Sequence, residues 1–189
     1  MLISREIAVD LLLGFVILLG CVSVNTGQGD TTQPKPVSSG DHNMTIRVGE
    51  LDRRYTVHVP PGYNGKTFAP VVIMLHGGGG TGEAAATETG WGVKADEAEF
   101  LAVFPDAIPP DPTKPSRFRG NPQLWNDGSG RFYLGQKAPD DVGFINAMLD
   151  ELITKFAVDQ RRIFVTGFSN GASMCFRVGA ELSKRIAIL

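Results

Sequence analysis

The sequence predicts a domain of the α/β class, with a mostly parallel sheet and an antiparallel hairpin at its N-terminal side. Three observations predict it. Two alternating strand patterns come first, apolar runs of strand length then alternate with helical patterns, and two glycine-rich turns each follow such a run. The chain has 189 residues, of which 42% are hydrophobic and 20% charged, as is usual for a globular protein. One folded domain is therefore expected.

Positive and negative charges nearly balance. The sequence holds 18 Lys and Arg against 20 Asp and Glu, for a formal net charge of −2. A chain this close to neutral has no basic surface with which to neutralise phosphates, so a nucleic-acid partner is not expected. Attachment to a membrane through a polybasic patch is not expected either.

The first twenty residues are predicted to be a signal peptide. The apolar stretch from Leu11 to Leu19 is too short to span a bilayer, which takes about 20 residues. Its end, Leu18-Leu19-Gly20-Cys21, resembles the bacterial lipobox. That resemblance implies export to the cell envelope or the extracellular space, with a lipid on Cys21 as the membrane attachment. Export without a lipid and an uncleaved anchor are the alternatives.

Residues 21–43 are predicted to form a flexible tether, because they are rich in Ser, Thr, Gly and Pro and contain almost nothing to bury. The folded part is then expected to span residues 44–189. If Cys21 is lipidated or removed, Cys175 is left unpaired, and no disulfide framework is expected. Cys175 falls in an apolar helical pattern, where a free thiol acts as a small hydrophobe.

The first half of the domain is predicted to begin with an antiparallel hairpin, because two runs alternate between apolar and polar residues. A continuous apolar run follows and suits a strand buried on both faces. The predicted elements are strands 44–48, 54–59 and 69–75, a helix over 91–99 and a strand over 100–104. Repeated prolines then predict a long loop over 107–139, and a loop of this length in a compact domain is usually functional.

The second half is predicted to begin with an amphipathic helix whose apolar residues share one face. Asp140 or Asp141 is placed to cap this helix, which we favour over a catalytic role for either carboxylate. The predicted elements are a helix over 140–156, a strand over 162–166, a helix over 172–183 and the start of a further buried strand over 185–189.

The pentapeptide Gly167-Phe168-Ser169-Asn170-Gly171 fits the pattern G-x-S-x-G. It stands where a predicted strand gives way to a predicted helix, which is the context of a nucleophile elbow. The tight turn needs glycine on both sides because a Cβ would crowd the serine. Ser169 is therefore the candidate nucleophile, at the carboxyl edge of the sheet and over a helix N-terminus that stabilises an alkoxide.

His76 is followed by four glycines, again directly after a buried strand. Glycines let backbone N–H groups approach a reacting carbonyl, so two amides of this loop and that of Asn170 are predicted to form an oxyanion hole. A phosphate cradle is the competing use, but the loop lacks the spacing and the Lys-Ser/Thr pair of a P-loop. His76 itself is interpreted as a structural residue, since the base follows the serine in this chain order.

Several ordered blocks resemble the polyhydroxybutyrate depolymerase-like esterases, which are α/β-hydrolases related to feruloyl and acetylxylan esterases. The resemblance implies that Ser169 is the nucleophile, that amides near Gly78 and Gly79 and that of Asn170 bind the oxyanion, and that Trp125 lines the site, with plain packing as the alternative for Trp125. No metal or cofactor is implied. The blocks are Leu75–Gly80, Trp125–Asn126, Asp140–Phe144 and Val158–Ala172.

A serine esterase also needs a histidine base and an acid that orients it. The three histidines, His42, His58 and His76, all precede Ser169, whereas in α/β-hydrolases the acid and the base follow the nucleophile. We therefore expect the N-terminal part of a longer esterase, lacking the downstream Asp and His and inactive by itself.

The leading hypothesis is an exported serine esterase that acts on a polyester, a polysaccharide-linked feruloyl or acetyl ester, or a small acyl ester through an acyl-enzyme. A peptidase or a dienelactone-type hydrolase on the same fold is a second reading. A catalytically dead, membrane-tethered polymer-binding protein is a third. An unrelated α/β domain with an accidental G-x-S-x-G remains as the unremarkable explanation.

Overall fold

The computed structural model describes residues 37–130 and 137–187. The predicted signal peptide, Cys21 and the tether up to residue 36 lie outside the described residues. Within the described ranges, no helix is both long and apolar enough to cross a bilayer.

A sheet of five strands forms the centre of the domain, in the order β1-β2-β4-β3-β5. The first two strands form an antiparallel hairpin, and β2 also pairs antiparallel with β4. The other three strands run parallel to one another. The predicted α/β class is therefore confirmed, with a mixed sheet that is antiparallel on the side of β1 and β2 and parallel across β4, β3 and β5. The strands are β1 (Gly40–Val48), β2 (Leu51–Val59), β3 (Ala69–Leu75), β4 (Leu101–Pro105) and β5 (Val158–Gly167).

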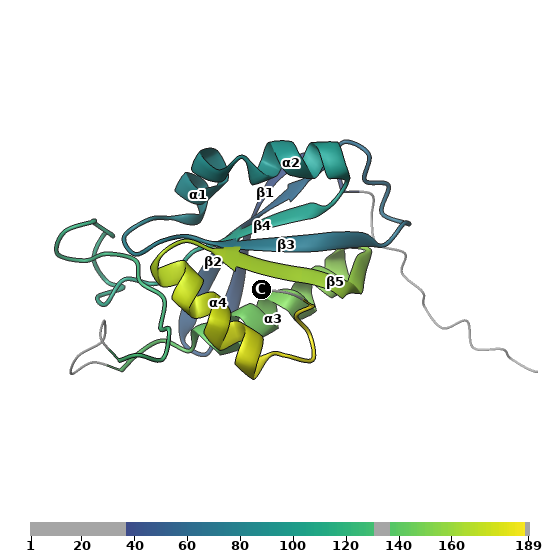
Figure 1. Ribbon diagram of the computed structural model, residues 1–189. Helices are drawn as coiled ribbons and strands as arrows, with labels where there is room; N and C mark the ends of the chain where they lie inside the picture. The colour runs from purple at the N-terminus through teal and green to yellow at the C-terminus, as the bar shows by residue number, and fades with distance from the viewer. Residues whose placement is uncertain (1–36, 131–136, 188–189) are drawn as a thin grey trace, which may run out of the picture. The chain divides into compact units, whose positions relative to one another are not determined.

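Helices cover both faces of the sheet (Figure 1). The first two, α1 and α2, lie on one face, and α3 and α4 lie on the other. This layered arrangement follows from the sequence, because each parallel crossover places a helix against the sheet. The helices are α1 (Gly82–Thr89), α2 (Trp91–Ala98), α3 (Asp141–Lys155) and α4 (Asn170–Glu181).

The larger hydrophobic core lies between the sheet and the α3/α4 layer. Alternate residues of β2 face it, and α3 contributes the apolar face that its periodicity predicts. A smaller core under α1 and α2 contains Met74, Phe100 and Phe104. Cys175 is buried in the larger core, as predicted.

Several boundaries differ from the sequence prediction, and one helix was not predicted. β2 begins three residues earlier than predicted, at Leu51, and α4 begins two residues earlier, at Asn170. β1 begins at Gly40, so residues 40–43 belong to the sheet rather than to the tether. β5 begins at Val158, although the charged residues 159–162 do not look like a strand. Helix α1 was not predicted: Thr81 caps it by accepting a hydrogen bond from Ala84 N–H at 3.0 Å, and its alanines have high helix propensity.

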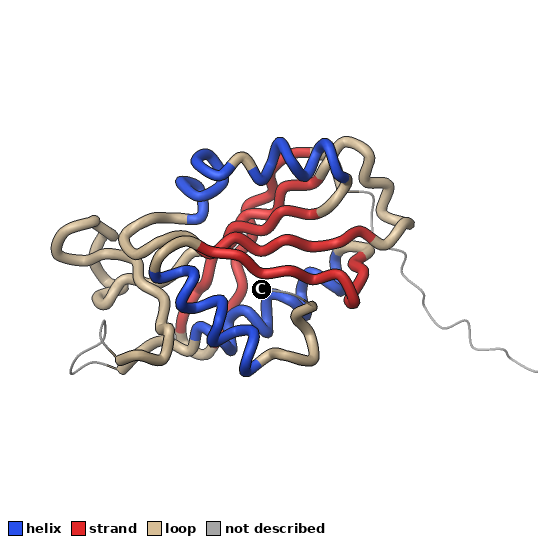
Figure 2. The backbone as a smooth tube through the Cα atoms, viewed as in Figure 1, coloured by secondary structure: helices blue, strands red, loops and turns tan. Residues whose placement is uncertain are grey.

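The predicted long loop between β4 and α3 contains no helix and no named strand in its described part, residues 106–130 and 137–140 (Figure 2). Isolated bridges, Ile108 to Leu124 and Arg117 to Asn121, fold the loop on itself. At the other end of the described chain, Ile186 is buried and Ala187 N–H donates to Ile163 O at 2.8 Å. Residues 182–185 form a turn and no strand is assigned at 186–187, so the further strand predicted over 185–189 is not seen in its described part, and residues 188–189 lie outside the described ranges.

Candidate active site

The carboxyl ends of β3, β4 and β5 meet at one edge of the sheet, because these three strands are parallel. Each end leads into a segment with a predicted role. The glycine loop follows β3, the long loop follows β4, and the G-x-S-x-G turn follows β5. Ligand sites of open α/β sheets lie at this edge, which makes it the candidate active site.

Ser169 occupies the tight turn between β5 and α4. Its backbone has φ 52° and ψ −116°, a conformation that a residue with a side chain rarely adopts. The residue is exposed, and within the described chain its hydroxyl has no hydrogen-bond partner. Gly171 N–H donates to Phe168 O at 2.8 Å and closes the turn. A strained, exposed serine at a helix N-terminus is the arrangement of a nucleophile elbow.

The two glycines of the turn are required by close packing. A Cβ on Gly171 would lie 2.2 Å from Leu75 O, and one on Gly167 would lie 2.6 Å from the backbone of Gly171. Both obstacles are backbone atoms, one at the end of β3 and the other in the first turn of α4, and neither can move aside without disturbing its element. Glycine is thus needed at both positions, but the atoms that a Cβ would meet belong to the backbone of β3 and α4 rather than to the serine that the sequence argument named.

The glycine loop after β3 lies directly against the elbow. A Cβ on Gly77 would be 3.6 Å from Ser169 Cβ, and one on Gly78 would be 3.6 Å from Asn170 Cβ. In the described chain, neither Gly78 N–H nor Asn170 N–H donates to a backbone or side-chain acceptor. The predicted oxyanion donors included an amide near Gly79, but the Gly79 N–H donates to Gln123 O at 2.7 Å and is already used. Gly78 and Asn170 remain as candidate oxyanion donors.

His76 is a structural residue in this arrangement, as the sequence suggested. It is buried, and both ring nitrogens contact the backbone: Nδ1 donates to Gly77 O at 2.7 Å and Nε2 accepts from Ala107 N–H at 3.1 Å. Burial lowers its pKa below the ordinary value, which favours the neutral ring that these two bonds need. His76 thus joins the glycine loop to the start of the long loop.

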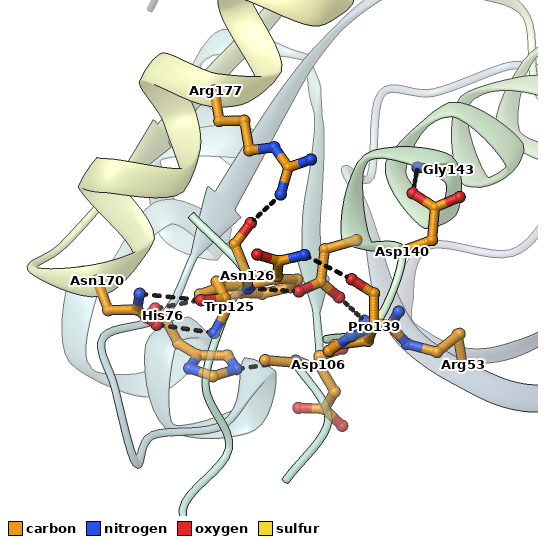
Figure 3. A network of polar contacts seen from close by, with 12 residues as sticks. Arg53, His76, Asp106, Trp125, Asn126, Pro139, Asp140, Gly143, Asn170 and Arg177 are labelled. Carbon is orange, nitrogen blue, oxygen red and sulfur yellow. Dashed lines mark hydrogen bonds and ion pairs between the residues drawn. The ribbon is translucent and has the colours of Figure 1, made fainter. Parts of the chain in front are cut away.

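Asn170 holds the long loop against the elbow (Figure 3). Its side-chain oxygen accepts from Trp125 N–H at 2.7 Å, and its Nδ2 donates to Trp125 O at 3.1 Å. The indole N–H of Trp125 donates in turn to His76 O at 2.9 Å. Trp125 has no exposed surface, so in the structure it packs in the core, the second of the two roles that the sequence left open.

A buried ion pair also holds the long loop between β4 and α3 in place. Arg53 of β2 and Asp141 of α3 lie 2.6 Å apart with 1% and 0% of their side chains exposed. Asp141 also accepts from Asn126 N–H at 2.7 Å, and Asn126 O accepts from Arg177 of α4 at 2.7 Å (Figure 3). Burial raises the pKa of Asp141, against the opposing effect of Arg53 and the Asn126 amide.

Sequence reasoning missed the part that Arg53 and Arg177 play in this support. Arg53 stands in the alternating pattern of β2 at a position that faces the core, and a charge at an inward position was the available signal. Asp140 caps α3 by accepting from Gly143 N–H at 2.8 Å, so of the two adjacent aspartates one is the cap and the other the buried partner.

The remaining histidines lie away from Ser169. His58 pairs with Ala102 near the start of β4, at the amino edge of the parallel strands, and His42 lies on the edge strand β1. His58 bridges two carboxylates, with Nδ1 2.6 Å from Asp41 and Nε2 2.9 Å from Asp96. Burial lowers the pKa of His58, but the hydrogen bonds to Asp96 and Asp41 outweigh it and the net direction is upward. Thus none of the three histidines is placed to take a proton from Ser169.

Within residues 37–130 and 137–187, no group of three or more His, Cys, Asp or Glu side chains could hold a metal ion. The chemistry that the described site can support is that of its backbone amides and of Ser169. These are suited to attack on a carbonyl and to stabilisation of the resulting oxyanion.

Comparisons with known proteins find esterases among the relatives of this chain. The chain is 28% identical over 151 residues to a putative esterase, NocK, of Nocardia uniformis subsp. tsuyamanensis, covering 78% of this chain and 40% of that protein. It is 23% identical over 152 residues to feruloyl esterase D of Neurospora crassa, covering 80% of this chain and 48% of that protein. The chain therefore spans less than half the length of these two curated relatives.

The fold of this chain is also similar to that of a solved esterase structure. Acetyl xylan esterase from Aspergillus awamori matches with a TM-score of 0.61 and 19% identity, over 79% of this chain and 50% of that one. The model of the phospholipase/carboxylesterase family matches residues 64–188, which is more than half of the chain. By this match, the chain is a member of the phospholipase/carboxylesterase family, with the fold of the α/β-hydrolases.

Proposed function

We propose that this chain carries the nucleophile and the oxyanion hole of a serine esterase. Ser169 attacks the carbonyl carbon of a carboxylic ester, the alcohol leaves, and water then hydrolyses the acyl group bound to Ser169 Oγ. The observation that carries the proposal is the strained, exposed Ser169 at the N-terminus of α4, next to the unpaired N–H groups of Gly78 and Asn170. Such a donor contributes about 3 kcal/mol in the transition state.

We further propose that these 189 residues do not turn over an ester by themselves. His76 is held by two backbone hydrogen bonds. His58 in β2 is separated from β5 by two further strands of the sheet, and His42 in β1 by three. Among the described residues, no histidine is therefore placed to act as the general base of Ser169, and serine is a weak nucleophile at neutral pH without a base. The acid and the base of the complete site are supplied from outside the described arrangement.

The nucleophile role is tested by Ser169→Cys, because a thiol at a helix N-terminus ionises without a histidine. We expect p-nitrophenyl butyrate to release a burst of one p-nitrophenolate per chain and to leave a butyryl group on position 169, seen by mass spectrometry. Each unit by which the elbow lowers the thiol pKa raises the thiolate fraction about tenfold.

Ser173→Cys is the matched control, since Ser173 lies one turn further along α4. The unchanged chain reports the reactivity of its own thiols, and burial raises the pKa of Cys175 to about 12, which keeps that background low. Acylation of Ser169→Cys no faster than of Ser173→Cys would contradict the proposal.

The missing base is tested with the unchanged chain and Ser169→Ala. Equal, background rates of p-nitrophenyl butyrate hydrolysis are expected for both. Turnover that disappears in Ser169→Ala would overturn this part of the proposal, because it would require a base among the residues described.

One observation favours a second function, a binding role without catalysis. None of the three histidines reaches Ser169, so the elbow could serve as a scaffold in a protein that binds an ester polymer. Absence of the acylation burst from Ser169→Cys, together with binding to a polyester or a polysaccharide film, is the result that would support this alternative.

We also propose that the chain is exported and carries a lipid on Cys21, on the resemblance of Leu18–Cys21 to a lipobox. Expression in a bacterium with labelled palmitate should label the unchanged chain and not Cys21→Ser. Equal labelling, or none in either, would contradict the lipid. An unshortened N-terminus in the mature protein would contradict cleavage of the signal peptide.

A further inference from the structure

A cavity of about 710 Å³ opens beside the elbow, between the glycine loop, α1 and the end of β5. Gly77 and Phe168 line it, and both are immediate neighbours of Ser169: a Cβ on Gly77 would lie 3.6 Å from Ser169 Cβ. The candidate nucleophile therefore stands at the rim of this cavity. A group attached to a carbonyl on Ser169 can extend into it.

The cavity exists because small residues line the side formed by α1 and the glycine loop. Ala84 and Ala85 project from α1, and the glycines have no side chains to fill the space. A volume of this size suits a ligand much larger than an acetyl group, since binding pockets for small organic molecules measure about 300–1,000 Å³. An acetyl ester would leave most of the cavity to water.

Three large aromatic side chains are among the residues that line the cavity. Phe118 of the long loop and Phe168 of the elbow are 74% and 72% exposed, and Trp91 of α2 lines the interior. The Phe118 ring lies on Gly79, where a Cβ would be 2.5 Å from Phe118 Cδ2. Large exposed aromatic residues on the walls of a cavity gain from covering by another flat, apolar group.

The charge of the cavity lining favours neutral ligands over anionic ones. Glu88 is the one side chain with a formal negative charge among the described residues that line the cavity, and none of them is Lys or Arg. A carboxylate ligand would meet this charge without a counter-charge, whereas a neutral ester would not.

We propose that this cavity binds the uncharged aromatic group of an ester whose acid part is aromatic, as in methyl cinnamate, and that Phe118 and Phe168 determine this specificity. The inference rests on the proposed esterase function only for the statement that the bound group belongs to an ester. Hydrolysis of such an ester gives an alcohol and a carboxylate, so a neutral ligand becomes an anion, for which the described cavity lining offers Glu88 and no Lys or Arg.

The test measures binding rather than turnover and uses the full chain with Ser169→Ala, so that no acyl transfer interferes. Methyl cinnamate, methyl acetate and sodium cinnamate are titrated by ligand-observed NMR. We expect saturable binding of methyl cinnamate, binding of sodium cinnamate weakened by the like charge of Glu88, and no detectable binding of methyl acetate. Equal binding of methyl acetate and methyl cinnamate would overturn the proposal.

Variants in the same Ser169→Ala background locate the ligand. Adding Ala84→Phe fills the cavity and should abolish methyl cinnamate binding, while Thr87→Phe, on the same helix but outside the lining, should leave it unchanged. Adding Phe118→Ala should weaken binding about three- to tenfold through loss of one aromatic contact. Adding Glu88→Gln should bring sodium cinnamate closer to methyl cinnamate in affinity.

Unchanged affinity in Ala84→Phe would place the ligand elsewhere and sink the proposal. Failure of the esterase function is distinguishable from this outcome. If Ser169→Cys is not acylated but methyl cinnamate still binds in a way sensitive to Ala84→Phe, the aryl site holds and the nucleophile role falls. If Ser169→Cys is acylated but Ala84→Phe changes nothing, the reverse conclusion follows.

Discussion

Each end of β2 carries a basic side chain paired with carboxylate groups, but the two ends differ in how far these side chains are exposed to solvent. At the carboxyl edge of the parallel strands, Arg53 pairs with Asp141 with almost no exposed surface. At the amino edge, His58 bridges Asp41 and Asp96, whose side chains are 66% and 42% exposed. Alternation along the strand points Arg53 toward α3 and His58 toward α2.

The difference teaches which cluster the candidate active site depends on. The buried Arg53–Asp141 pair is connected to Asn170 of the elbow by hydrogen bonds through Asn126 and Trp125. The hydrogen bonds of His58 go to Asp41 and Asp96, which are not part of this chain of contacts. A charge without its partner in a dry site is costly, but a half-exposed one is relieved by water. The two ends should therefore respond very differently to substitution.

The largest effect is expected from Asp141→Ala, which leaves the Arg53 guanidinium buried without its partner. We expect a loss of about 3–5 kcal/mol in the free energy of unfolding, measured by urea denaturation. Asp140→Ala is the matched control, because it removes only the cap of α3, worth about 1 kcal/mol. Equal losses at the two positions would mean that the ion pair has no special weight.

A smaller effect is expected from Asn170→Ala, which leaves the buried Trp125 N–H and C=O without partners. The free energy of unfolding should fall by about 1–3 kcal/mol. Release of the long loop should also speed tryptic cleavage after Arg117 and Arg119 in the native state. Glu181→Ala, at the exposed end of α4, should change the free energy of unfolding by less than about 0.5 kcal/mol. Unchanged cleavage in Asn170→Ala would show that the loop is held by other contacts.

The smallest effect is expected at the His58 end and depends on pH. Because the pKa of His58 is raised in the folded state, its contribution to stability is fully present below its ordinary value of 6.5 and is lost as the pH rises through the folded-state pKa. The free energy of unfolding, followed by urea denaturation across this window, should decline in the unchanged chain. The decline should be absent in His58→Gln and retained in His42→Gln.

Much of the fold could be predicted from the pattern of apolar residues. The continuous run of β3 and the single apolar face of α3 were predicted at or within one residue of their ends, since burial on two faces or on one leaves a direct mark in the sequence. The start of β5 was missed because Asp159, Arg161 and Arg162 stay at the surface there. Helix α1 was missed because alanines give no apolar contrast.

The tight turn of the candidate site was predicted because its backbone geometry demands particular residue types, as at Gly167 and Gly171, whereas the role of Ser169 stays a prediction. The contacts of the site were not predicted where they depend on a residue that is distant in the sequence. Nothing near Gly79 in the sequence shows that its N–H is taken by Gln123, and nothing near Trp125 shows that the ring packs in the core. These contacts depend on the path of the long loop. The prolines in the sequence predict that a loop is present, but they do not predict its path.

The backbone of Ser169 has a consequence for the evolution of such a chain. Holding a residue with a side chain at φ 52° costs about 1–3 kcal/mol, and glycine would adopt the same conformation with little strain. Ser169→Gly is therefore a substitution that selection for stability alone would favour. A serine retained at this position has to be maintained by a benefit other than folding.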